Sequence, residues 1–159
     1  MAHDDVLRWL AVHAPDVPMI IPGASTATVA EAAAALGVEP ARIAKTLAMR
    51  VNGEVLLLVT RGDARLDNRK ARESLGGKPR MLDAGETLAV TGHAVGGVCP
   101  FGLATDVPVW VDVSLKAFPT VFPAGGDRLS SVEIAPERLA SLVACGWVDA
   151  CTLPMITNY

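Results

Sequence analysis

The sequence has few of the residues from which metal sites and disulfide frameworks are built. Its three cysteines and three histidines are scattered along 159 residues, without the paired spacing of a zinc site. Apolar runs such as residues 55–59 fall far short of the ~20 residues that span a bilayer. We therefore expect reduced structural cysteines, no metal and no membrane contact.

Two nucleotide-binding patterns are also missing. The glycine-rich residues 92–102 lack the G-x-G-x-x-G spacing and the following helix of a dinucleotide site, and no G-K-S or G-K-T occurs. The first five residues include two aspartates, whereas a secretory signal begins with basic residues. These absences predict a cytoplasmic protein that uses no cofactor.

Charged residues are few and unevenly placed. The chain has 14 basic and 17 acidic residues, a net charge of −3, yet half of the basic residues fall within residues 61–80. Four arginines recur there at helical spacing, which would form a stripe suited to a phosphate backbone or merely a solvated helix face. The predicted RNA-binding residues are Arg61, Arg65, Arg69, Lys70 and Arg72. A local patch favours transient contact with RNA, and we expect no DNA binding.

Helix and strand signals alternate along the chain. Amphipathic spacing predicts a helix over residues 4–13, and capping patterns predict helices after Thr28, Asp67 and Asp83, a short one at 40–44 and a last one after Pro136. Strands are predicted at 17–21, 46–51, 54–60, 97–98, 107–113, 120–123 and 131–135. Asn52-Gly53 predicts a tight hairpin turn between the second and third of these.

This mixture of hairpins and helices predicts a single α+β domain over residues 1–159. Strict strand-helix-strand repetition would indicate a parallel, doubly wound sheet, and the sequence does not show it. We expect a mixed, mostly antiparallel sheet flanked by helices.

Residues 91–102 contain four glycines and Pro100 around a small apolar turn. Glycine has no Cβ, so the amides of Gly96, Gly97 and Val98 can approach a ligand closely, while Pro100 restricts the exit of the turn. Such a turn presents a fixed set of N–H donors.

Several short motifs, taken in order, resemble the YbaK family of aminoacyl-tRNA deacylases, which includes the prolyl-tRNA synthetase-associated editing domain. They are P-x-x-I-A-K-T-L at 40–47, G-D-x-x-L-D at 62–67, G-G-V-C-P-F-G at 96–102, A-G-G at 124–126 and V-E-I-A-P at 132–136. Their order and spacing over nearly the whole chain carry the resemblance. It implies a barrel-like sheet with flanking helices and a pocket that hydrolyses the ester of a mischarged tRNA after release from the synthetase.

The resemblance and the chemistry of ester hydrolysis together predict the site. The predicted catalytic residues are Lys45, Gly96, Gly97, Val98, Cys99 and Pro100. The predicted substrate-binding residues are Thr46, His93, Phe101, Gly102, Ala124, Gly125 and Gly126. Backbone amides would stabilise the oxyanion and Lys45 would position the substrate, with water, assisted by the neighbouring ribose hydroxyl, as the attacking group. Position alone favours an ordinary lysine at a helix end, and the matching A-K-T-L context favours the functional reading.

The substrate and two alternative functions stay open. Cysteine-deacylating members resemble one another in a serine and an aspartate where this chain has Ala124 and Ser131, so we expect another small amino acid, alanine being the simplest. The expected partner is an aminoacyl-tRNA, bound transiently, with tRNA-Pro as one candidate and an aminoacyl-tRNA synthetase as a second candidate partner. The alternatives are a hydrolase with Cys99 as nucleophile beside His93, and a non-catalytic RNA-binding or synthetase-associated module.

Overall fold

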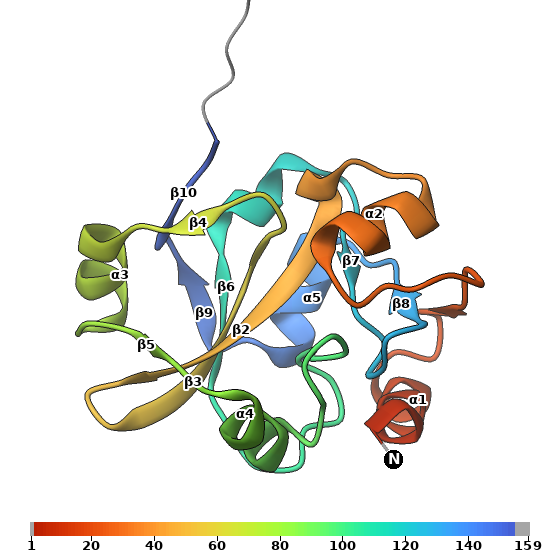
Figure 1. Ribbon diagram of the computed structural model, residues 1–159, viewed down its shortest axis with the longest axis horizontal. Helices are drawn as coiled ribbons and strands as arrows, with labels where there is room; N and C mark the ends of the chain where they lie inside the picture. Colours follow the sequence, from red (N-terminus) through yellow and green to blue (C-terminus); the bar gives the residue numbers. More distant parts are fainter. Residues whose placement is uncertain (1, 155–159) are drawn as a thin grey trace, which may run out of the picture.

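A mixed β-sheet forms the centre of the molecule in the computed structural model, which describes residues 2–154 (Figure 1). Its strands run in the order β5-β2-β3-β6-β9, and β7 also pairs with β2. They are β2 (Ile43–Val51), β3 (Glu54–Arg61), β5 (Arg80–Met81), β6 (Val109–Asp112), β7 (Phe122–Pro123) and β9 (Gly146–Val148). The sheet is open, with β5 and β9 at its two ends, and is not closed into a barrel.

Two short strand pairs and the helices surround this sheet. The pairs are β1 (Met19–Ile20) with β8 (Ser131–Val132), and β4 (Arg65–Leu66) with β10 (Cys151–Thr152). The helices are α1 (Ala2–His13), α2 (Val29–Leu36), α3 (Asn68–Leu75), α4 (Ala84–Thr91) and α5 (Pro136–Val143), with 3-10 turns η1 (Pro40–Arg42) and η2 (Val113–Ala117). In Figure 1, α3 lies on the side of the sheet opposite α1 and α2. Among residues 2–154, no helix has the length and apolarity needed to cross a membrane.

The β2–β3 hairpin forms as predicted. Asn52 and Gly53 both have positive φ, 52° and 79°, which a two-residue turn between right-twisted strands requires. The two strands are antiparallel, with Val51 opposite Glu54. Because the side-chain period of a strand is two, this turn fixes which β2 residues face each side of the sheet.

The predicted helix caps are also present. The side chains of Thr28, Asp67 and Asp83 accept hydrogen bonds from the backbone N–H three residues later. The Glu86 carboxylate in turn accepts from the Asp83 backbone N–H, which completes a capping box. Each of these helices ends at a glycine with positive φ, as expected for a left-handed C-cap.

Alternate residues of β2 and β3 enter two separate cores. The core next to α1 and α5 includes Ala44, Ala48, Leu57 and Val59. The core next to α3 includes Met49, Val51, Leu56 and Leu58. Both faces of the central hairpin are therefore buried, which explains its nearly continuous apolar sequence.

Two sequence predictions need correction. Gly97–Val98 forms a turn and no strand. The arginines at helical spacing do not share one helix, because Arg61 ends β3, Arg65 lies in β4 and only the later ones belong to α3. The mixed, mostly antiparallel pairing is as predicted, with β7, β6 and β9 joining the sheet in parallel.

Candidate active site

A cavity of about 250 Å³ lies along the outer edge of β2. On this edge β7 pairs with Ile43 and Ala44, and β5 pairs with Met49 and Arg50. The Leu82 N–H also bonds to the Ala48 carbonyl on this edge, so residues 45–47 lie between the pairings, and at a rise of ~3.3 Å per residue they leave a gap about 10 Å long. The walls come from β2, α2 and the loop before it, the start of α4, the 95–98 turn and β7.

Five of the predicted site residues line this cavity. They are Lys45, Thr46, Gly96, Val98 and Ala124. They come from three separate segments of the chain, which the sheet pairings bring to one place. Their roles in substrate binding and catalysis remain predictions, whereas their shared location is a property of the fold.

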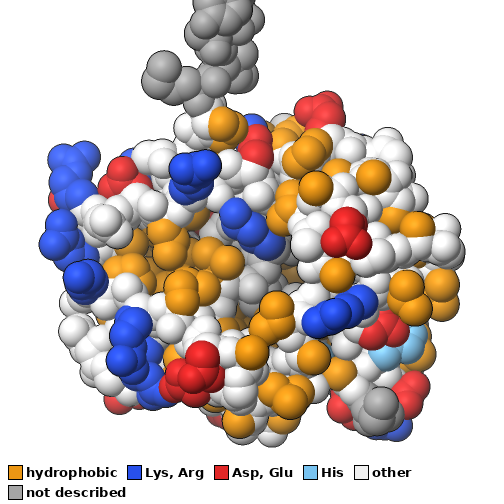
Figure 2. Space-filling view, viewed as in Figure 1, with side chains coloured by type: hydrophobic (Ala, Val, Ile, Leu, Met, Phe, Trp, Pro, Cys, Tyr) orange, Lys and Arg blue, Asp and Glu red, His pale blue; other side chains and the backbone are white. Residues whose placement is uncertain are grey.

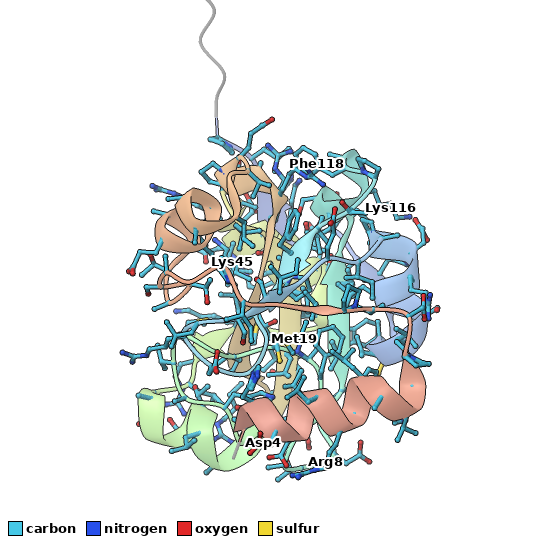
Figure 3. All side chains as sticks on the ribbon, turned by 90° about the vertical axis from the view of Figure 1, so that its right-hand side faces the viewer. Asp4, Arg8, Met19, Lys45, Lys116 and Phe118 are labelled. Carbon is cyan, nitrogen blue, oxygen red and sulfur yellow. The ribbon has the colours of Figure 1, made fainter. Side chains whose placement is uncertain are left out.

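Lys45 is a half-buried cation held by a neutral partner. Its Nζ donates to the Ala64 carbonyl at 2.6 Å, and Figure 3 shows the residue where β2 passes beneath α2. Burial lowers the pKa of Lys45, while Cys151 and Asp63 oppose that shift. Asp63 is itself bound by Arg61, at 2.6 and 3.0 Å, so no described carboxylate forms an ion pair with Lys45.

The 95–98 turn forms another part of the cavity wall through Val95, Gly96 and Val98. Gly96 has a φ of 99° and lies against the Arg128 side chain, whose Nε donates to the Val95 carbonyl at 3.2 Å. Among the described residues, no acceptor is found for the N–H of Gly96 or of Val98.

Gly97 closes the turn and packs against a neighbouring loop. Its N–H donates to the Ala94 carbonyl at 2.9 Å, closing the turn, so this amide is already used. A methyl group at Gly97 would lie 2.7 Å from backbone atoms of Asp127. The absent side chain lets the turn pack against the 124–127 loop.

Cys99 and His93 lie behind the turn, outside the cavity. Both are fully buried, with Sγ 3.7 Å from Nε2, and that nitrogen lies 2.7 Å from the Phe101 carbonyl oxygen. Burial raises the pKa of the Cys99 thiol to about 12 and lowers the pKa of His93. The pair therefore lies close together as the nucleophile hypothesis required, but in a position that disfavours a reactive thiolate.

The other predicted substrate-binding residues pack against the N-terminal segment and do not line the cavity. Phe101 is fully buried against Trp9, with ring centroids 5.4 Å apart, and Gly102 lies against the Asp5 backbone. Gly125 packs against Met19, and Gly126 packs against α1. Pro100, which was predicted to be catalytic, borders a shallow cleft on the far side of the turn. Figure 3 shows Met19 on the extended segment that crosses this side. These residues therefore contribute to packing around the turn and not to the wall of the cavity.

The predicted RNA-binding residues differ in availability. Arg61 is bound by Asp63 and lies over the Phe118 ring, and Lys70 bonds to Asp149 and to the Cys151 carbonyl. Arg65, Arg69 and Arg72 are exposed. Figure 2 shows basic side chains along the side of the molecule formed by α3, next to a face rich in apolar side chains.

Other lining residues carry no recognisable sequence signal. Val29, Leu82 and Phe122 complete the apolar wall, and Thr26 and Ser131 contribute hydroxyls. Buried residues of these types occur in any protein core, so only their tertiary placement assigns them to a site. Among residues 2–154, no group of three His, Cys, Asp or Glu side chains is placed to hold a metal ion.

Comparison with known proteins identifies relatives of this chain. A Bacillus subtilis protein named only YwhH is 51% identical over 129 residues, 80% of this chain and 82% of its own length. An Enterococcus faecalis protein, EbsC, named as a candidate Cys-tRNA(Pro)/Cys-tRNA(Cys) deacylase, is 32% identical over 69% of this chain and 68% of its own. A crystal structure described as a candidate trans-editing enzyme for prolyl tRNA synthetase is 31% identical, with a TM-score of 0.87 over 95% of this chain and 97% of the other.

The family model of the aminoacyl-tRNA editing domain matches residues 23–142. The chain therefore belongs to this family, as the resemblance to YbaK proteins indicated. It also matches the proline–tRNA ligase of Lysinibacillus sphaericus, 30% identical over 70% of this chain but only 20% of the ligase.

Substitution of Gly97 tests how tightly the turn is packed. Gly97→Ala should lower the free energy of unfolding by about 1–3 kcal/mol, because the new methyl group meets backbone atoms that cannot move aside. Gly85→Ala is the control, since its methyl group meets only the Asp83 Oδ1 at 3.5 Å and alanine favours the helix. Urea unfolding measures both, and equal midpoints for Gly97→Ala and the unmodified protein would contradict the packing described.

Thiol reactivity tests the position of Cys99. In the native protein iodoacetamide should modify the exposed Cys145 and leave Cys99 unmodified, because Cys99 is buried and its pKa is raised to about 12. Mass spectrometry of tryptic peptides identifies the modified thiols. Rapid stoichiometric alkylation of Cys99 would restore the nucleophile hypothesis.

Proposed function

We propose that this protein hydrolyses, in trans, the ester bond of a mischarged aminoacyl-tRNA that carries a small amino acid. The observation that carries the proposal is that Lys45, Gly96 and Val98 line one largely apolar cavity, in a member of the editing-domain family. The candidate trans-editing structure, matched over nearly the whole of both chains, supports action as a separate protein.

The proposed chemistry needs orientation and charge stabilisation more than a side-chain nucleophile. An aminoacyl ester is already activated, and attack by water places negative charge on the former carbonyl oxygen. The N–H groups of Gly96 and Val98 would donate to that oxygen, at ~3 kcal/mol for each well-placed donor. The neighbouring ribose hydroxyl of the substrate would assist the water.

Lys45 would hold the negatively charged end of the tRNA or the ester carbonyl at the mouth of the cavity. Its charge is available for this because its partner is the neutral Ala64 carbonyl. A partly desolvated ammonium also interacts more strongly with an anion than an exposed one does.

The walls favour a small apolar amino acid. The hydroxyls of Thr26, Thr87 and Ser131 already donate to carbonyls of Ser130, Asp83 and Pro123, at 3.2, 2.8 and 2.9 Å. A polar substrate side chain would therefore find few free partners, whereas a methyl group needs none. Alanine is the amino acid we propose first, with tRNA-Pro as its carrier.

Replacement of Lys45 tests the function directly. Lys45→Ala should lower the rate of alanine release from mischarged tRNA-Pro by at least ~100-fold, because the charge that orients the substrate is removed. Lys116→Ala is the matched control, since that lysine lies over the Trp147 ring, away from the cavity. The assay is time-dependent release of labelled amino acid from a panel of mischarged tRNAs. Undiminished release by Lys45→Ala would overturn the assignment, and binding without release by the unmodified protein would support the non-catalytic module.

Removal of exposed arginines on α3 tests the RNA interface. The double variant Arg69→Ala/Arg72→Ala should raise the KM for tRNA and reduce the slope of log(kcat/KM) against log salt by ~0.7–0.9 for each phosphate that the variant no longer neutralises. The control, Arg8→Ala/Arg138→Ala, removes two arginines that are paired with Asp5 and Asp16 on other surfaces. Identical salt slopes in the two double variants would exclude α3 from the interface.

A further inference from the structure

On the outer edge of β2, some backbone N–H and C=O groups form no hydrogen bond with a neighbouring described strand. Successive residues of an antiparallel strand turn their N–H and C=O groups to opposite sides. The Ala48 carbonyl accepts from the Leu82 N–H at 3.0 Å, on the side away from β3. Ala44 pairs with β7 on that same side. Thr46, two residues from each, therefore turns its own N–H and C=O to this side.

Thr46 lies in the gap between the two neighbouring pairings. The β7 ladder ends at Ala44 and the β5 ladder at Met49, so neither reaches it. Its side-chain Oγ1 is also buried without a hydrogen-bond partner among the described residues. Since unpaired buried backbone groups are costly, an unpaired residue that lines a cavity marks a place where a ligand completes the pairing.

We propose that this edge holds the aminoacyl end of the substrate, with the Thr46 carbonyl accepting a hydrogen bond from its α-ammonium group. This inference rests on the proposed function. None of the described residues that line the cavity is a carboxylate, so a carbonyl is the acceptor that the wall offers to a cation. The Lys45 ammonium repels a second cation, which turns the α-ammonium toward Thr46 and leaves the ester carbonyl to the donors at Gly96 and Val98.

The consequence is selectivity for esters that carry a free α-ammonium. An α-hydroxy acid ester of the same shape keeps a donor but has no charge there, and a charge-assisted hydrogen bond is about twice as strong as a neutral one. The protein would thus recognise the substrate's α-ammonium group through its own backbone atoms, whatever the side chain of the substrate amino acid.

The test compares alanyl-tRNA-Pro with lactyl-tRNA-Pro, made from the same preparation by nitrous acid, which replaces the α-ammonium with a hydroxyl. Each enzymatic rate is divided by the uncatalysed rate at the same pH, because the ammonium also activates the ester chemically. The alanyl ester should be accelerated at least ~10-fold more than the lactyl ester. Thr46→Val removes the hydroxyl but keeps the carbonyl, so the ratio of the two accelerations should persist in this variant.

Each result bears on a separate claim. Equal acceleration of both esters would overturn the role of the β2 edge while leaving the proposed deacylase function standing. Loss of the discrimination in Thr46→Val would assign the ammonium contact to the side chain and overturn the main-chain role. Failure to accelerate either ester would overturn the proposed function, and this inference with it.

Discussion

The interrupted pairing along the outer edge of β2 is the constraint on which the site depends. β2 is nine residues long, but its neighbours on that edge are two-residue strands at either end. β7 ends where Ala124 turns to bridge Ser131, and β5 ends where Asp83 begins the next helix. On this outer edge, the middle of the strand has no strand partner among the described residues, and the cavity lies along it.

The cavity combines a cation with an apolar wall without neutralising the cation. A buried lysine commonly pairs with a carboxylate, but here the nearby Asp63 is bound by Arg61 and the ammonium is held by a carbonyl. Burial then lowers the pKa of Lys45 without providing an ion pair that a substrate would have to break. Elsewhere in the wall, the Gly97 N–H closes the turn that carries Gly96 and Val98.

Local signals predicted much of the fold. The Asn52-Gly53 turn and the caps at Thr28, Asp67 and Asp83 depend on contacts within a few residues, so the sequence specifies them directly. β4, β5, β9 and β10 were not predicted, because strands of two or three residues exist only through distant partners. The prediction of a strand at Gly97–Val98 was wrong, because these residues form part of a turn.

The site was predictable only in part, for a related reason. Lys45 and the glycine turn stand out by residue type, and both line the cavity. Composition could not separate Gly96, which faces the cavity, from Gly125 and Gly126, which pack against the N-terminal segment. Nor could it reveal that Thr46 lies in a gap, since that depends on where two other strands stop. The proximity of Cys99 to His93 is real, yet burial rather than distance decides its chemistry.

The most direct test of the central claim is an NMR titration of the protein with a non-hydrolysable analogue, 3′-alanylamino-3′-deoxyadenosine. If the β2 edge and the glycine turn form the binding site, the largest backbone amide shifts will occur at Thr46, Gly96 and Val98. Shifts confined to the cleft bordered by Pro100 and Thr105, with those three amides unchanged, would contradict the account.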